Sequence, residues 1–113
     1  MNAPDLHLGQ DRASAESIQL APKTLLRHML ALGSSGSGKT VLSKVVVEEM
    51  VRLGIPALCV DPQGDLCSLA LRGDAAAWAE QGVDAELAQA FSERADVVVF
   101  TPAAQYGVPL VAD

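Results

Sequence analysis

A glycine-rich stretch in the first half of the chain carries the most distinctive chemistry of the sequence. Residues 33–40 read Gly-Ser-Ser-Gly-Ser-Gly-Lys-Thr and fit the phosphate-binding loop pattern G-x-x-x-x-G-K-[ST] at every defined position. Glycines let the backbone bend so that its N–H groups approach phosphate oxygens. Lys39 adds a mobile positive charge for the outer phosphates, and the Thr40 hydroxyl suits Mg²⁺. We predict a Mg-ATP site formed by Gly33, Ser34, Ser35, Gly36, Ser37, Gly38, Lys39, Thr40 and Val41.

The segments on either side of this loop have the hydrophobic patterns of a strand and of a helix, as the motif requires. Residues 28–32 form a short apolar run that predicts a buried strand, and a helical pattern begins after Gly38. Strand, loop and helix in this order are the context of a phosphate-binding loop. A flexible Gly/Ser linker has a similar composition, but such linkers are rarely flanked by apolar segments of opposite period. We therefore interpret the stretch as a nucleotide site.

Apolar spacing predicts the elements that position this site. A helix is expected over residues 41–53, ended by Gly54 in the left-handed position after the helix, with Lys44, Glu48 and Arg52 spaced four apart on one face. Residues 55–60 are almost continuously apolar, as in a strand buried on both faces. A right-handed crossover would make this strand parallel to the first one. Further elements are expected as helices at 66–72, 74–81 and from Asp84, a strand at 97–100, and a loop from 103 to 113.

The second strand runs into Asp61-Pro62-Gln63-Gly64-Asp65. Loops at the carboxyl ends of parallel strands face the ligand crevice, so Asp61 and Asp65 are candidate catalytic carboxylates, and Asp61 is also a candidate Mg²⁺ ligand. In the alternative interpretation, Asp61 opens a Pro-Gln-Gly turn and Asp65 caps the next helix. The apolar run before Asp61 resembles a Walker B strand, but Pro62 stands where a second acidic residue often follows.

Composition limits the classes of function. The chain has 113 residues and a net charge of −6, which argues against a broad basic surface for nucleic acid. One Trp, one Tyr and two Phe provide no aromatic stacking platform. No apolar run approaches the ~18 residues of a membrane span, and no signal peptide is apparent. The apolar neighbours of Cys59 and Cys67 favour reduced, packed thiols and a cytoplasmic location.

Three segments together resemble the HerA–FtsK superfamily of P-loop ATPases, closest to HerA-like ATP-binding proteins. They are Arg27-His28 leading into the loop at 33–40, the Asp61–Asp65 segment, and residues 97–102 followed by Gly107-Val108-Pro109-Leu110. The resemblance implies an α/β fold of the RecA/FtsK-like P-loop type, with a parallel sheet and flanking helices. It also implies a hexameric motor that hydrolyses ATP to translocate or unwind DNA, or to move protein in secretion and conjugation relatives.

The same resemblance sets the expected domain organisation. Residues 1–27 would form an N-terminal hairpin that leads into the domain, and residues 28–113 the N-terminal part of a P-loop ATPase domain. Such a domain usually has five or more parallel strands, and three are found here. The acidic Walker B strand, the catalytic carboxylate and the arginine finger have no counterpart in these residues. We therefore expect a fragment of a longer protein that binds ATP but is inactive alone.

Three other functions share parts of this pattern. A small-molecule kinase has the same loop but needs an arginine-rich lid, and the arginines here are scattered. A dinucleotide-binding protein would have glycines spaced G-x-G-x-x-G, and Lys39 and Thr40 would then have no role. A regulatory module that binds nucleotide without hydrolysing it remains compatible with the loop.

Overall fold

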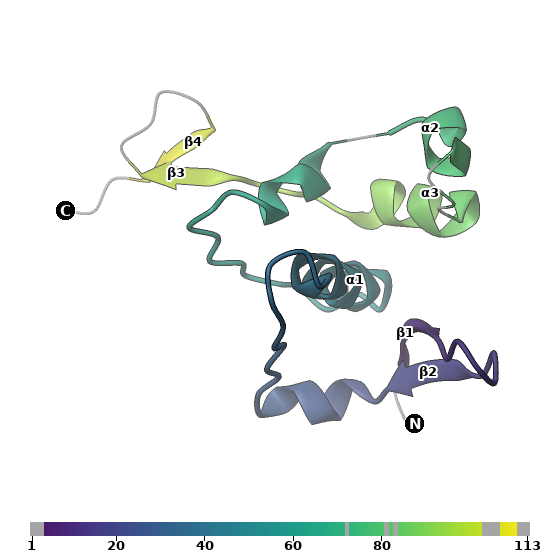
Figure 1. Ribbon diagram of the computed structural model, residues 1–113. Coiled ribbons are helices and arrows are strands. Elements are labelled where there is room, and N and C mark those ends of the chain that lie inside the picture. Colours follow the sequence, from purple (N-terminus) through teal and green to yellow (C-terminus); the bar gives the residue numbers. More distant parts are fainter. Residues whose placement is uncertain (1–3, 72, 81, 83, 103–106, 111–113) are drawn as a thin grey trace. The chain divides into compact units, whose positions relative to one another are not determined.

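The computed structural model of the chain divides into two compact units, Met1–Cys59 and Val60–Asp113, and each is described by itself (Figure 1). Both units contain helices and short strands. The structure describes residues 4–71, 73–80, 82, 84–102 and 107–110.

The first unit begins with an antiparallel hairpin. Strand β1 (Leu6–Gln10) pairs with β2 (Ser17–Leu20), with Leu6 opposite Leu20 and a bulge between His7 and Gly9. At the tip, the Asp11 carboxylate accepts the N–H groups of Ala13 and Ser14, both at 2.8 Å. The hairpin expected within residues 1–27 is therefore present. A 3₁₀ helix, η1 (Pro22–Leu26), follows it and starts with a proline, whose missing N–H is harmless there.

Helix α1 (Lys39–Arg52) is the longest element of the chain and directly follows the glycine-rich loop. Its C-terminal end is closed by Gly54, which has a φ of +77°. The N–H of Gly54 bonds to the carbonyl of Val51, and that of Ile55 bonds to Met50, both at 2.9 Å. These two bonds satisfy the last carbonyls of the helix. The predicted role of Gly54 as the helix terminator is confirmed.

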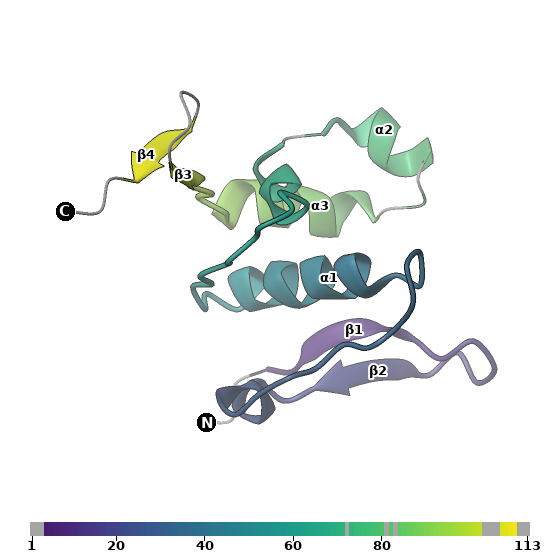
Figure 2. The same cartoon turned by 60° about the vertical axis from the view of Figure 1, so that its left-hand side comes forward.

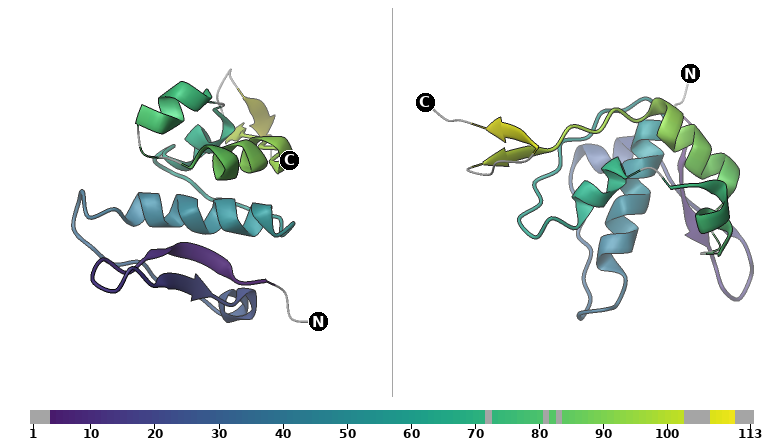
Figure 3. Two further views of the ribbon diagram at one scale, coloured as in Figure 1. Left: turned by 90° about the vertical axis from the view of Figure 1, so that its right-hand side faces the viewer. Right: turned by 90° about the horizontal axis from the view of Figure 1, so that it is seen from above.

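The hairpin packs on α1 through β1, and this contact is the core of the first unit (Figures 2 and 3). Leu6 is fully buried, and Val46 of α1 is 7% exposed. Leu6 and Val46 are the only buried apolar residues in the described part of the chain. The hairpin is therefore attached to the same helix that the glycine-rich loop begins.

The second unit contains three short helices and a parallel strand pair. Helix α3 is capped by Asp84, whose carboxylate accepts the N–H groups of Glu86 at 2.9 Å and Leu87 at 3.2 Å, as predicted. Asp74 caps α2 in the same way through the N–H of Ala77. The elements are η2 (Leu66–Ala70), α2 (Ala75–Glu80), α3 (Ala85–Arg94), β3 (Phe100–Pro102) and β4 (Val108–Leu110).

The predicted central sheet differs from the observed one. Residues 28–32 and 55–60 are in no ladder, and the strand expected at 97–100 begins only at Phe100. The described residues form two sheets of two strands each, and the parallel pair is β3 with β4, of which β4 lies in the tail that was expected to be loop.

The exposure of the apolar runs explains this difference. Leu30 is 79% exposed and Leu58 is 93% exposed, so both predicted strands lack neighbours. Apolar runs indicate burial on two faces but do not provide the partner strands. The predicted α/β class is confirmed, but residues 28–32 and 55–60 do not pair as parallel strands.

The two cysteines are also placed differently from expectation. Cys59 and Cys67 are both exposed free thiols, so the prediction that they are packed is wrong. Cys59 lies in the uncovered 55–60 run. Cys67 lies in η2, and its Sγ donates to the carbonyl of Gly64 at 2.7 Å. Apolar neighbours in sequence did not lead to burial of either thiol, because in the described part of the chain neither segment is covered by another element.

Candidate functional site

The glycine-rich loop connects the extended residues 28–32 to the first turn of α1. Gly36 and Gly38 have φ angles of +78° and +95°. Residues other than glycine are strained in this region of backbone conformation. The N–H of Ser37 bonds to the carbonyl of Ser34 at 3.1 Å and closes a tight turn. Two glycines of the motif are therefore required by the backbone path of the loop.

Gly33 is favoured for a different reason, because Ser37 lies close to its Cα atom. A Cβ atom at this position would collide with the hydroxyl of Ser37 and would lie 3.0 Å from the Ser37 Cβ. The two ends of the loop therefore approach each other, and a side chain at Gly33 would push them apart. All three glycines of residues 33–40, the two defined by the motif and Gly36, have a structural reason in this loop.

The N-terminus of α1 has no side-chain cap. Its cap residue is Gly38, which has no side chain to accept a hydrogen bond. The first bond across the helix start runs from Leu42 N to Gly38 O at 2.9 Å. The N–H groups of Lys39, Thr40 and Val41 precede this bond and have no acceptor in the described residues. Free donors and the positive end of the helix dipole together favour a bound anion.

Lys39 lies back over the loop. Its Nζ donates to the carbonyl of Gly33 and, at 2.9 Å, to the carbonyl of Ser34. Both acceptors are neutral carbonyls. A charged phosphate oxygen would accept a stronger, charge-assisted hydrogen bond from the same ammonium group and could replace them. Thr40 is exposed in the first helical turn, beside these donors.

These residues fit the phosphates of a nucleotide. The loop provides one ammonium group, several backbone N–H groups and no carboxylate. Across the described ranges, no group of three or more His, Cys, Asp or Glu side chains is placed to hold a metal ion. The loop itself would give an expected Mg²⁺ one oxygen, the Thr40 hydroxyl, and phosphate and water oxygens are the usual further ligands of this ion.

Asp61 organises the turn that follows residues 55–60. One carboxylate oxygen, Oδ1, accepts the N–H groups of Gly64 at 3.0 Å and Asp65 at 3.1 Å. The other oxygen, Oδ2, accepts those of Leu66 at 2.7 Å and Cys67 at 3.3 Å. The turn interpretation of Asp61 is confirmed by these bonds.

Asp65 is at the expected position, but the predicted capping bond from its side chain is absent. It stands at the N-cap position of η2 but makes no side-chain capping bond, because Asp61 has taken the N–H groups there. Its side chain is exposed. The loop at 33–40 belongs to the first unit, whereas Asp61 and Asp65 belong to the second. Their predicted catalytic roles, and the predicted Mg²⁺ ligation by Asp61, therefore stay predictions.

Sequence reasoning missed an ionic cluster between the hairpin and α1. Glu49 is 8% exposed and accepts the His7 N–H at 2.6 Å. It also accepts two bonds from Arg52, at 2.8 Å from Nε and 2.7 Å from Nη2. Arg52 and Glu49 thus form an ion pair between residues three apart on α1. The available signal was an acidic residue on the apolar face of a predicted helix.

The pKa of Glu49 reflects this environment. Burial alone would raise the pKa of Glu49, but the hydrogen bonds from Arg52 and from the His7 N–H outweigh it. The net result is a pKa below the ordinary value for glutamate. Glu49 is therefore ionised near neutral pH and holds the hairpin on the helix that carries the loop.

Comparison with protein-family models identifies a family for this chain. A protein-family model described as helicase HerA-like C-terminal matches residues 6–113. The match starts at the first residue of β1 and includes both the glycine-rich loop and the Asp61 turn. Neither the curated proteins nor the solved structures contain a match. Within the described residues, every helix is too short or too polar to cross a membrane.

Proposed function

The chain belongs to the helicase HerA-like C-terminal family, and from this premise we propose that residues 33–41 bind Mg-ATP. In the intact protein, ATP hydrolysis would drive translocation or unwinding of DNA. The family match places the chain in a helicase and ATPase context. The observation that carries the proposal is the position of Lys39 over a glycine loop at an uncapped helix start.

Each group of the loop has a separate task in this proposal. The Lys39 ammonium would leave the carbonyls of Gly33 and Ser34 and bind the outer phosphates. The N–H groups at the start of α1 would bind phosphate oxygens, and the Thr40 hydroxyl would hold Mg²⁺. The metal ion would neutralise charge on the β- and γ-phosphates. These contacts bind and orient the nucleotide.

Hydrolysis also needs a group that positions the attacking water. We extend the proposal to Asp61 and Asp65 for this role, and Asp65 is favoured. Its carboxylate is exposed, whereas both oxygens of Asp61 already accept backbone N–H groups. Asp61 would then act by fixing the turn that presents Asp65.

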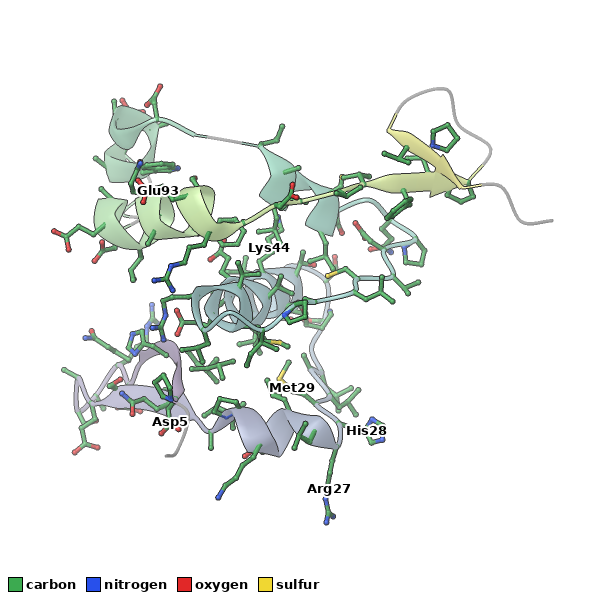
Figure 4. All side chains as sticks on the ribbon, turned by 180° about the vertical axis from the view of Figure 1, so that it is seen from behind. Asp5, Arg27, His28, Met29, Lys44 and Glu93 are labelled. Carbon is green, nitrogen blue, oxygen red and sulfur yellow. The ribbon has the colours of Figure 1, made fainter. Side chains whose placement is uncertain are left out.

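DNA contact and assembly follow from the family in this proposal. The net charge of −6 makes a broad DNA-binding surface unfavourable for a single chain. A ring of six copies would instead bring a few basic side chains of each copy to a common pore. Arg27, which points outward at the end of η1, is exposed (Figure 4).

Replacement of Thr40 tests the predicted Mg²⁺ contact. We expect Thr40→Ala to weaken ATP binding mainly when Mg²⁺ is present, because only the metal-ligating hydroxyl is lost. Thr40→Ser keeps the hydroxyl and should bind nearly as well as the wild type. Calorimetric titrations with ATP, in Mg²⁺ and in EDTA, measure both variants. Equal losses for Thr40→Ala in the two buffers would contradict the metal-ligand role.

A further inference from the structure

A groove of about 470 Å³ lies in the second unit, between α2 and α3. Its lining combines one aromatic ring, small apolar side chains and acidic or amide groups. No lysine or arginine is among its lining residues. The residues are Trp78, Ala85, Glu86, Gln89, Ala90 and Glu93.

Trp78 forms the aromatic part of this groove and is held in place from behind. Its pyrrole edge lies against the backbone of Gly73, where an added Cβ would be 3.1 Å from the indole Cδ1. The ring is half-buried, so part of it remains open to the groove. Ala85 and Ala90 also line the groove, and their side chains are small. A flat, fixed aromatic surface is therefore accessible from solvent.

Two carboxylates stand on the α3 side of the same groove. Glu86 and Glu93 are seven residues apart, so they lie on one face of the helix, two turns from each other. Both are exposed. The Gln89 amide donates to Glu93 Oε1 at 2.7 Å and orients that carboxylate. The groove thus has an aromatic wall and two negative charges on its edge.

We propose that this groove binds an arginine side chain of a partner protein. A guanidinium group is planar, stacks on an indole face and forms paired hydrogen bonds with carboxylates. The groove offers both kinds of contact and has no positive charge of its own. A lysine ammonium would satisfy the charge but not the stacking. The groove belongs to the second unit and the glycine-rich loop to the first, and the proposal goes beyond nucleotide binding.

The single tryptophan of the chain makes the test direct, because all indole fluorescence comes from the groove. N-acetyl-arginine amide is titrated into the intact chain while Trp78 emission is recorded. We expect a saturable change in emission with arginine amide, a several-fold weaker response with the lysine analogue, and none with the neutral citrulline analogue. No saturable response to arginine, or equal responses to arginine and citrulline, would overturn the proposal.

Variants then locate the binding. Glu86→Gln and Glu93→Gln should each weaken the arginine response about fivefold, as expected for one exposed ion pair. Glu80→Gln is the matched control: it removes the same charge from α2 outside the groove lining and should change nothing. Ala85→Leu fills the groove without changing charge and should abolish the response. Undiminished binding in Ala85→Leu and in both groove Glu→Gln variants would contradict the assignment.

Discussion

Lys39→Ala is expected to weaken Mg-ATP binding by about 10- to 150-fold, or roughly 1.5–3 kcal/mol, which is the usual contribution of a charge-assisted hydrogen bond. In the structure the Lys39 ammonium is held by two neutral carbonyls, those of Gly33 and Ser34. A phosphate is a stronger acceptor for the same group, so its binding energy depends on this charge. Calorimetric titration of both proteins measures the loss.

Lys44→Ala is the matched control for that experiment. It removes the same charge from the same helix, about one turn further from the loop. We expect its ATP affinity to stay within about twofold of wild type, since Lys44 lies outside residues 33–41 and its charge interacts with Glu48. Equal affinities for wild type and Lys39→Ala, or equal losses in the two variants, would contradict the role of Lys39.

The second large effect is expected at Glu49. Glu49→Gln should lower the free energy of unfolding of the first unit by roughly 1.5–3 kcal/mol, since hydrogen bonds to a charged, buried group are lost. The carboxylate accepts bonds from the His7 N–H and from Arg52, and the neutral amide cannot replace all of them. Urea unfolding followed through the NMR signals of β1 measures the change. Glu16→Gln, at the exposed end of the hairpin, is the control and should have little effect.

The same residue predicts how stability depends on pH. The pKa of Glu49 is lowered in the folded protein, so its contribution is fully present above the unfolded pKa of about 4.3. It is lost as the pH falls through the lower, folded pKa. We therefore expect the wild type to lose more stability between pH 5 and pH 3 than Glu49→Gln does. Parallel pH dependences of the two proteins would show that Glu49 carries no such linkage.

Features that depend on neighbouring residues could be predicted from the sequence. Gly54 ends α1 and Asp84 caps α3 because both roles are decided within one helical turn. The glycine positions of the loop follow from the same kind of local constraint. The hairpin was also expected, since its two strands are separated by only a short polar tip.

Features that depend on distant residues could not be predicted. The apolar runs at 28–32 and 55–60 indicated strands, but pairing needs a partner that a periodicity does not identify. Glu49 lies on the apolar face of the predicted helix, but its burial and its partners depend on the packing of β1 on α1, which the sequence does not identify. In the Asp61 turn, two carboxylates compete for the same N–H groups. The outcome depends on the path through Gly64, whose φ is +79°.

The most direct test of the central proposal is a ¹H–¹⁵N NMR titration of the intact chain with Mg-ATP. If residues 33–41 bind the phosphates, the amide signals of Gly36, Gly38, Lys39 and Thr40 should shift together and saturate. The signals of Ala13 and Ser14, whose N–H groups are bonded to Asp11 at the hairpin tip, should not move. Saturable binding that leaves the loop amides unshifted, or no shift at any ATP concentration, would contradict a phosphate site in this loop.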